Sequence, residues 1–111
     1  MRLPAIFVTH GGGPLPLLGK QPFIETSLAS IGSNLPIVPK SIVVITAHWE
    51  TDIVSINADP SPSLLFDYSG FPPESYRYSY NARGSPELAS TIADLLAEKS
   101  IPHKVASIRQ W

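Results

Sequence analysis

The pattern of hydrophobic and polar residues predicts alternating strands and helices. Residues 5–9 and 41–47 are continuous apolar runs rich in β-branched side chains, which is typical of strands buried on both faces. Residues 53–58 alternate apolar and polar side chains, as in a half-exposed or edge strand. A further strand is predicted over residues 103–108.

Two helices are predicted between these strands. The first begins at Pro22, which suits the first helical position, and stops before Pro36 and Pro39. Its apolar residues at helical spacing are Ile24, Leu28, Ile31 and Leu35. The second begins with Ser85 as N-cap and Pro86 at the first helical position. Its predicted core-facing residues are Leu88, Ile92, Leu95 and Leu96.

This order of elements predicts an α/β fold. A buried strand, a crossover helix and a second buried strand form a βαβ unit, which implies a parallel sheet. We therefore expect a mostly parallel central sheet flanked by helices, within one domain, since 111 residues leave no room for a second core. Residues 59–83 lack periodicity and are rich in Pro, Ser, Tyr and Phe, which predicts a long ordered loop.

Composition narrows the classes of function. The formal net charge of -1 argues against a nucleic-acid partner, because such proteins need a basic surface. There is no cysteine, so any metal ion must be held by His, Asp or Glu. No apolar stretch approaches the roughly 20 residues of a membrane helix, and the N-terminal run is too short for a signal peptide. We expect no membrane partner and a cytoplasmic location.

Two histidines are the candidate metal ligands. His10 and His48 each follow one of the two predicted buried strands, and ligands of parallel sheets bind beyond the carboxyl ends of the strands. Neighbouring strands lie about 4.8 Å apart, so two such imidazoles could share one Fe(II) or Zn(II) ion. A hydrogen-bonding or capping role is the alternative for each histidine. Glu50 is either an acceptor that hydrogen-bonds a metal ligand or a charge on the loop after His48, and His103 is expected to be a surface or edge residue.

The glycines after His10 allow three interpretations. Gly11, Gly12 and Gly13 could cradle a phosphate, but the remaining residues of a P-loop or dinucleotide motif are missing. HGGG also forms the oxyanion hole of some esterases, but this chain has no G-x-S-x-G nucleophile motif. We favour a tight turn that lets the backbone crowd against its neighbours.

Aromatic residues are concentrated in the predicted loop. They are Phe66, Tyr68, Phe71, Tyr76, Tyr78 and Tyr80. Two roles are open for them: they line an aromatic pocket, or they pack the long loop onto the domain.

Three segments together resemble a known family. The runs FVTHGGGPLPLLG, IVVITAHWE and FDYSGFPPESYRYSYNARGSPELA are similar to the N-terminal half of the class III extradiol dioxygenases, in the 4,5-DOPA dioxygenase branch. The resemblance covers almost the whole chain, with Asn81 standing where the family usually has Pro. It implies that His10 and His48 bind a non-haem Fe(II), or Zn(II), and that the substrates are a catechol and O2. Which residues bind the substrate stays unknown.

The same resemblance implies that parts of the site lie elsewhere. The family's acid/base histidine belongs to an Asp-His-Gly motif shortly after a Trp, and the third metal ligand belongs to the C-terminal half. Neither this histidine motif nor the third ligand has a match here. Residues 1–111 are therefore expected to be the N-terminal part of one catalytic domain and inactive alone. A non-catalytic module that binds a metal or ligand on the same fold is the alternative.

Overall fold

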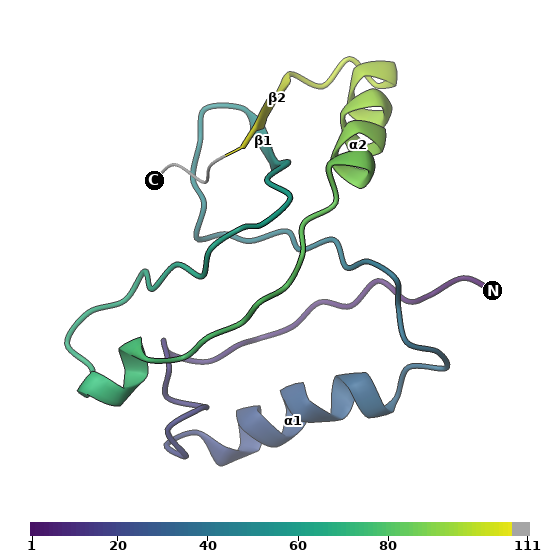
Figure 1. The fold of residues 1–111 in the computed structure, drawn as a ribbon. Helices are drawn as coiled ribbons and strands as arrows, with labels where there is room; N and C mark the ends of the chain where they lie inside the picture. The colour runs from purple at the N-terminus through teal and green to yellow at the C-terminus, as the bar shows by residue number, and fades with distance from the viewer. Residues whose placement is uncertain (108–111) are drawn as a thin grey trace. The chain divides into compact units, whose positions relative to one another are not determined.

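The computed structural model describes residues 1–107 as two compact units (Figure 1). The first unit consists of Met1–Ile42 and Phe66–Tyr78, and it contains α1 (Pro22–Ser33) and a short 3-10 turn (Pro73–Tyr76). The second consists of Val43–Leu65 and Ser79–Trp111, described as far as residue 107, and it contains β1 (Val54–Asn57), α2 (Pro86–Glu98) and β2 (His103–Ala106). Each unit is described by itself.

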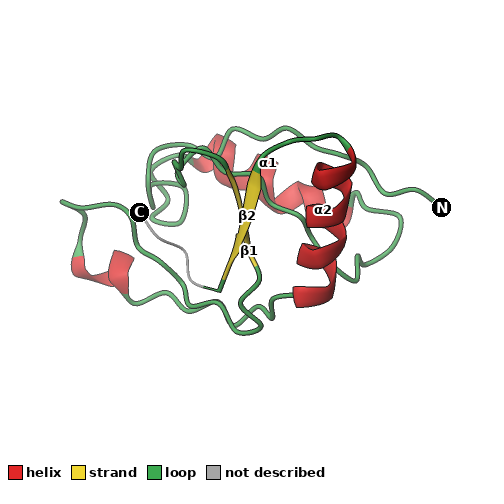
Figure 2. Ribbon diagram, turned by 90° about the horizontal axis from the view of Figure 1, so that it is seen from above, coloured by secondary structure: helices red, strands yellow, loops and turns green. Residues whose placement is uncertain are grey.

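A β1–α2–β2 crossover forms the second unit. β1 and β2 pair in parallel, with Val54 opposite His103 and Asn57 opposite Ala106. The Ala58 N–H extends the pairing by donating to the Ala106 carbonyl at 2.7 Å. Helix α2 packs against both strands, as Figure 2 shows. A parallel sheet with a crossover helix confirms the predicted α/β class, and β1 is half-buried as its alternating pattern predicted.

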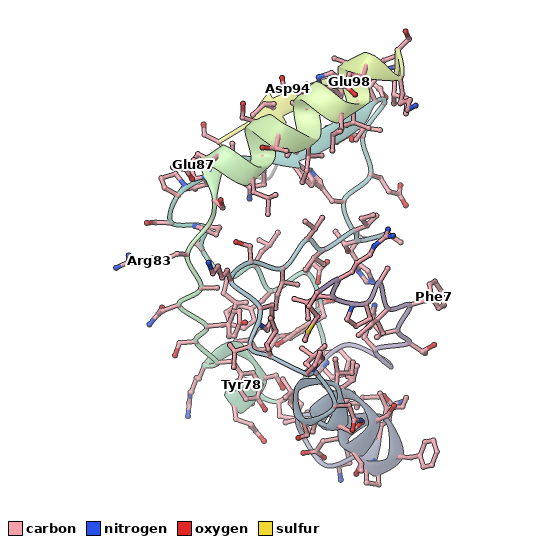
Figure 3. All side chains as sticks on the ribbon, turned by 90° about the vertical axis from the view of Figure 1, so that its right-hand side faces the viewer. Phe7, Tyr78, Arg83, Glu87, Asp94 and Glu98 are labelled. Atoms are coloured by element: carbon pink, nitrogen blue, oxygen red, sulfur yellow. The ribbon has the colours of Figure 1, made fainter. Side chains whose placement is uncertain are left out.

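Helix α2 begins where the sequence predicts. The Ser85 hydroxyl accepts a hydrogen bond from the Leu88 N–H at 3.2 Å, and Pro86 follows at the first helical position. One side of the helix is acidic, with Glu87, Asp94 and Glu98 exposed along it (Figure 3).

The buried face of α2 differs from the prediction at one position. Leu88, Ile92 and Leu96 are half-buried, but Leu95 is 54% exposed, and Ala89 is the buried apolar residue. The prediction that Leu95 faces the core is wrong. The buried face is centred on Ala89, with Ile92 and Leu96 beside it, and Leu95 lies at its edge, about 120° round the helix from Ala89.

Helix α1 gives the first unit its apolar surface. Ile24, Leu28, Ile31 and Leu35 are the half-buried residues predicted from helical spacing, although the helix itself ends at Ser33. Together with the extended residues 4–9, the later turns of α1 border a groove. The segment leading to His10 therefore lies along this helix.

Two predicted strands are absent from the described part of the chain. Residues 5–9 and 41–47 contain no strand, and several of their apolar side chains are open to solvent. Phe7 is 98% exposed and points away from the chain (Figure 3), and Ile45 is 95% exposed. A β-branched run becomes a strand only with a partner that accepts its ladder hydrogen bonds, and within residues 1–107 these two runs have none. The single parallel pair is instead formed by β1 and β2 in this range.

Between residues 1 and 107, neither helix has the length and apolar character needed to cross a membrane.

Candidate metal centre

His10 lies at the end of an extended segment, immediately before the glycine turn. Its Nδ1 lies 3.0 Å from the Gly11 carbonyl oxygen. Because a carbonyl oxygen only accepts, Nδ1 carries the proton in this hydrogen bond, and the neutral ring then has its lone pair on Nε2. A backbone carbonyl bound to one ring nitrogen is the usual way in which a metal-binding histidine is oriented. The exposed His10 side chain thus has the tautomer expected of an Nε2 ligand.

The glycines after His10 form a tight turn, as we favoured from the sequence. Gly11 and Gly13 have φ angles of 77° and 48°, in the left-handed region that favours glycine. A side chain on Gly13 would also meet the ring of Phe71 at 3.0 Å. The Gly12 N–H donates to the Gln21 side-chain oxygen at 3.0 Å, so it is engaged within the protein. Because this N–H already has a partner within the protein, the structure favours the tight turn and not a phosphate-binding loop.

His48 lies in a turn at the end of the second apolar run. Its side chain is exposed, and its backbone N–H donates to the Thr46 hydroxyl at 3.1 Å. Neither His48 nor His10 follows a strand, so the prediction that strand ends position them is wrong within the described residues. His10 belongs to the first unit and His48 to the second. Their sharing of one metal ion stays a prediction.

The third histidine has a structural position. His103 opens β2, is half-buried, and its Nδ1 lies 2.8 Å from the Ile101 carbonyl oxygen. This agrees with the edge position predicted for it. Across residues 1–107, no group of three or more His, Asp or Glu side chains is gathered in a way that could hold a metal ion. Glu50 is exposed, and its role near the site stays a prediction.

The aromatic residues of the first unit pack on one another. Tyr68 is the centre of this aromatic cluster, with ring centroids 5.9 Å from Phe66, 5.4 Å from Phe71 and 5.3 Å from Tyr76. Edge-on and tilted contacts of this kind stabilise loops. For these four residues the structure favours the packing role over the pocket.

Hydrogen bonds fix the cluster to its own backbone. The Tyr68 hydroxyl donates to the carbonyl of Ser75, a residue that is fully buried. Partial burial raises the pKa of the Tyr68 hydroxyl, and the nearby Tyr76, Tyr78 and Asp67 add to this effect. Because Phe71 also lies against Gly13, the aromatic cluster supports the turn that follows His10.

The sequence analysis did not single out Gln21, which contacts the same turn. Its side chain bonds the Gly12 N–H although Gln21 itself is the N-cap of α1. Gln is not among the residues preferred at N-caps, and this mismatch is the signal that could have drawn attention to it.

Comparison with known proteins agrees with the sequence motifs. Residues 20–110 match the family model described as the catalytic LigB subunit of aromatic ring-opening dioxygenase. A dioxygenase named tasH from Hapsidospora irregularis is 41% identical over 81% of this chain and 30% of its own length. The 4,5-DOPA dioxygenase extradiol of Beta vulgaris is 42% identical over 82% of this chain and 34% of its own length.

A bacterial relative gives the same result. The 4,5-DOPA dioxygenase extradiol of Escherichia coli (strain K12) is 38% identical over 86% of this chain and 34% of its own length. The chain thus spans about a third of the length of the curated relatives it matches. The family match and these identities show that this chain belongs to the LigB family of extradiol aromatic ring-opening dioxygenases.

Proposed function

We propose that this chain supplies His10 and His48 as two ligands of a non-haem Fe(II) or Zn(II) ion in a dioxygenase that opens catechol-type rings. The support is of two kinds. Relatives named 4,5-DOPA dioxygenase extradiol are 38% and 42% identical to it, and DOPA is a catechol. Both candidate ligands are imidazoles, which suit either metal in a chain that has no cysteine.

The observation that carries the proposal is the hydrogen bond from His10 to the Gly11 carbonyl. It places the proton on Nδ1 and the lone pair on Nε2, which is the state in which imidazole binds a divalent cation. The tight glycine turn keeps this carbonyl beside the ring.

When bound, the metal ion would orient the catechol and O2 and act as a Lewis acid in ring opening. His10 and His48 would hold that ion from two different parts of the chain. We further propose that residues 1–111 are the N-terminal part of one catalytic domain, and that a third ligand and an acid/base histidine come from outside these residues. The basis is that the sequence contains no Asp-His-Gly motif and that the chain spans about a third of the length of its relatives.

A chimera tests this function. Residues 1–111 would replace the matching segment of the Beta vulgaris enzyme, and ring opening of DOPA would be followed by the absorbance of the yellow product under Fe(II) and O2. We expect product from the chimera and little from the 111-residue chain alone. His10→Ala or His48→Ala in the chimera should abolish product, and His103→Ala should not.

Three results would count against the proposal. Strong turnover by the 111-residue chain alone would contradict the proposal that a third ligand and an acid/base histidine come from outside these residues. A chimera that folds by circular dichroism and binds iron without ring opening would instead favour the non-catalytic metal-binding module. Full activity of the His10→Ala chimera would remove this residue from the site.

A further inference from the structure

A single peptide group connects Gln21 to His10. The Gly11 carbonyl oxygen accepts from His10 Nδ1 at 3.0 Å, and the Gly12 N–H donates to Gln21 Oε1 at 3.0 Å. That carbonyl and that N–H belong to the same Gly11–Gly12 peptide. His10 and Gln21 are therefore bound to opposite ends of one planar unit.

The planarity of this peptide couples the two hydrogen bonds. Rotation of the plane that moves the N–H away from Gln21 also moves the carbonyl away from the His10 ring, because both groups are fixed in one plane. Hydrogen bonds in such a chain also polarise one another, so the bond to Gln21 makes the Gly11 carbonyl a better acceptor. Gln21 thus favours both the orientation and the Nδ1–H tautomer of His10.

The surroundings of Gly11 hold the Gln21 side chain in this role. A side chain on Gly11 would overlap Gln21 Oε1, and would also approach Pro16 at 3.0 Å and Ile24 at 3.2 Å. Gly11 therefore leaves the space that the Gln21 amide occupies. Its φ of 77° is a second reason for glycine at this position.

Helix α1 does not use the Gln21 side chain. Gln21 is the N-cap residue, but it makes no side-chain capping hydrogen bond. Pro22 follows at the start of the helix and has no N–H that needs a partner. The Gln21 amide is therefore directed to the glycine turn and not to its own helix, which separates its role from ordinary helix capping.

We propose that Gln21 is a positioning residue that orients His10 through the Gly11–Gly12 peptide and holds its proton on Nδ1. This inference concerns the ring of His10 and is independent of a bound metal. Its significance for metal affinity rests on the proposed function. The structure supports it through two hydrogen bonds on one peptide and the close fit of Gln21 against Gly11.

Nitrogen-15 NMR of the imidazole rings in the 111-residue chain tests the tautomer directly, at a pH at which the rings are neutral. We expect His10 to be mainly Nδ1–H in the wild type. Gln21→Met keeps the length of the side chain but removes the acceptor, and it should shift His10 towards Nε2–H, the tautomer that free histidine favours in water. Gln21→Glu keeps an acceptor oxygen and should retain Nδ1–H. His103, bonded to a different carbonyl, is the internal control and should not change.

A Gln21→Ser variant separates positioning from stability. Ser is a better N-cap than Gln, so the melting temperature should stay the same or rise while the His10 tautomer shifts. An unchanged His10 tautomer in both the Met and Ser variants would overturn the proposal. A tautomer change that appears only together with loss of helix in circular dichroism would also overturn it, because Gln21 would then act through folding.

Zinc titration then links this role to the site. Gln21→Met should weaken Zn(II) binding by about tenfold, the lower end of the range for groups that orient a metal ligand. If His10→Ala binds Zn(II) like the wild type, the proposed metal site fails while the NMR result on Gln21 still stands. If His10→Ala loses affinity and Gln21→Met does not shift the tautomer, the positioning role fails and the metal site stands.

Discussion

The α-carbon of Gly84 lies directly against the backbone carbonyl of Asp59, so any side chain at position 84 would overlap that oxygen. The Gly84 N–H also donates to the Pro60 carbonyl at 3.1 Å. These contacts join the chain after β1 to the start of α2. They explain why the residue before the N-cap of α2 is glycine.

Gly84→Ala should therefore destabilise the second unit. Relief of the overlap requires a backbone shift, and overpacking of this kind costs about 1–3 kcal/mol. Urea unfolding followed by circular dichroism measures this loss. Gly32→Ala is the matched control, because a side chain there meets nothing within 4 Å. Gly32 lies in α1, so its replacement should not lower stability. Equal stability of the Gly84→Ala variant and the wild type would contradict the contact with Asp59.

The N-cap of α2 gives a second prediction. Ser85→Ala removes the hydroxyl that accepts from the Leu88 N–H, and it should cost about 1 kcal/mol of unfolding free energy. Ser90→Ala, on an exposed position inside the same helix, should be neutral or slightly stabilising. Thermal unfolding of both variants makes the comparison. If the two substitutions had the same effect, the capping bond would contribute nothing.

We expect the ionisation of Tyr68 to lower the free energy of unfolding at alkaline pH. Its pKa is raised above the usual 10.0 in the folded chain, so the folded state favours the neutral hydroxyl. The resulting stabilisation is fully present below pH 10 and is lost as the pH rises through the folded pKa. Tyr68→Phe should remove this part of the pH dependence while keeping the ring. Urea midpoints of both proteins between neutral pH and about pH 11 measure it, and parallel curves would show that Tyr68 does not contribute.

Exposure of the two apolar runs gives a fourth prediction. Phe7 and Ile45 are 98% and 95% exposed, so Phe7→Ser and Ile45→Ser should each change the free energy of unfolding by no more than about 0.5 kcal/mol. If these residues lay in buried strands, the same truncations would cost about 3 kcal/mol or more. Denaturation of the two variants therefore distinguishes exposed segments from buried strands.

Helix positions were predictable because the signals that set them are local. Pro22, Ser85 and Pro86 act within one turn of the helix they start, and both helices begin where these residues predict. Strands depend on distant partners. The runs at residues 5–9 and 41–47 have stronger strand composition than β1 or β2, yet only β1 and β2 pair within residues 1–107, joined across α2.

Around His10, too, features set by local residues were predictable and features set by distant contacts were not. The glycine turn after His10 was predictable because positive φ angles at Gly11 and Gly13 belong to those residues themselves. The role of Gln21 was not predictable, because it depends on the turn folding back to the start of α1. Whether His10 and His48 meet at one ion depends on the whole chain, which a local motif does not describe.

Calorimetric titration of the 111-residue chain with Zn(II) tests whether His10 and His48 bind one metal ion. We predict one ion per chain, with affinity strongly reduced by His10→Ala and by His48→Ala separately, and unchanged by His103→Ala. Zn(II) binding that is equally strong in the His10→Ala, His48→Ala and wild-type chains would contradict a metal site shared by these two histidines.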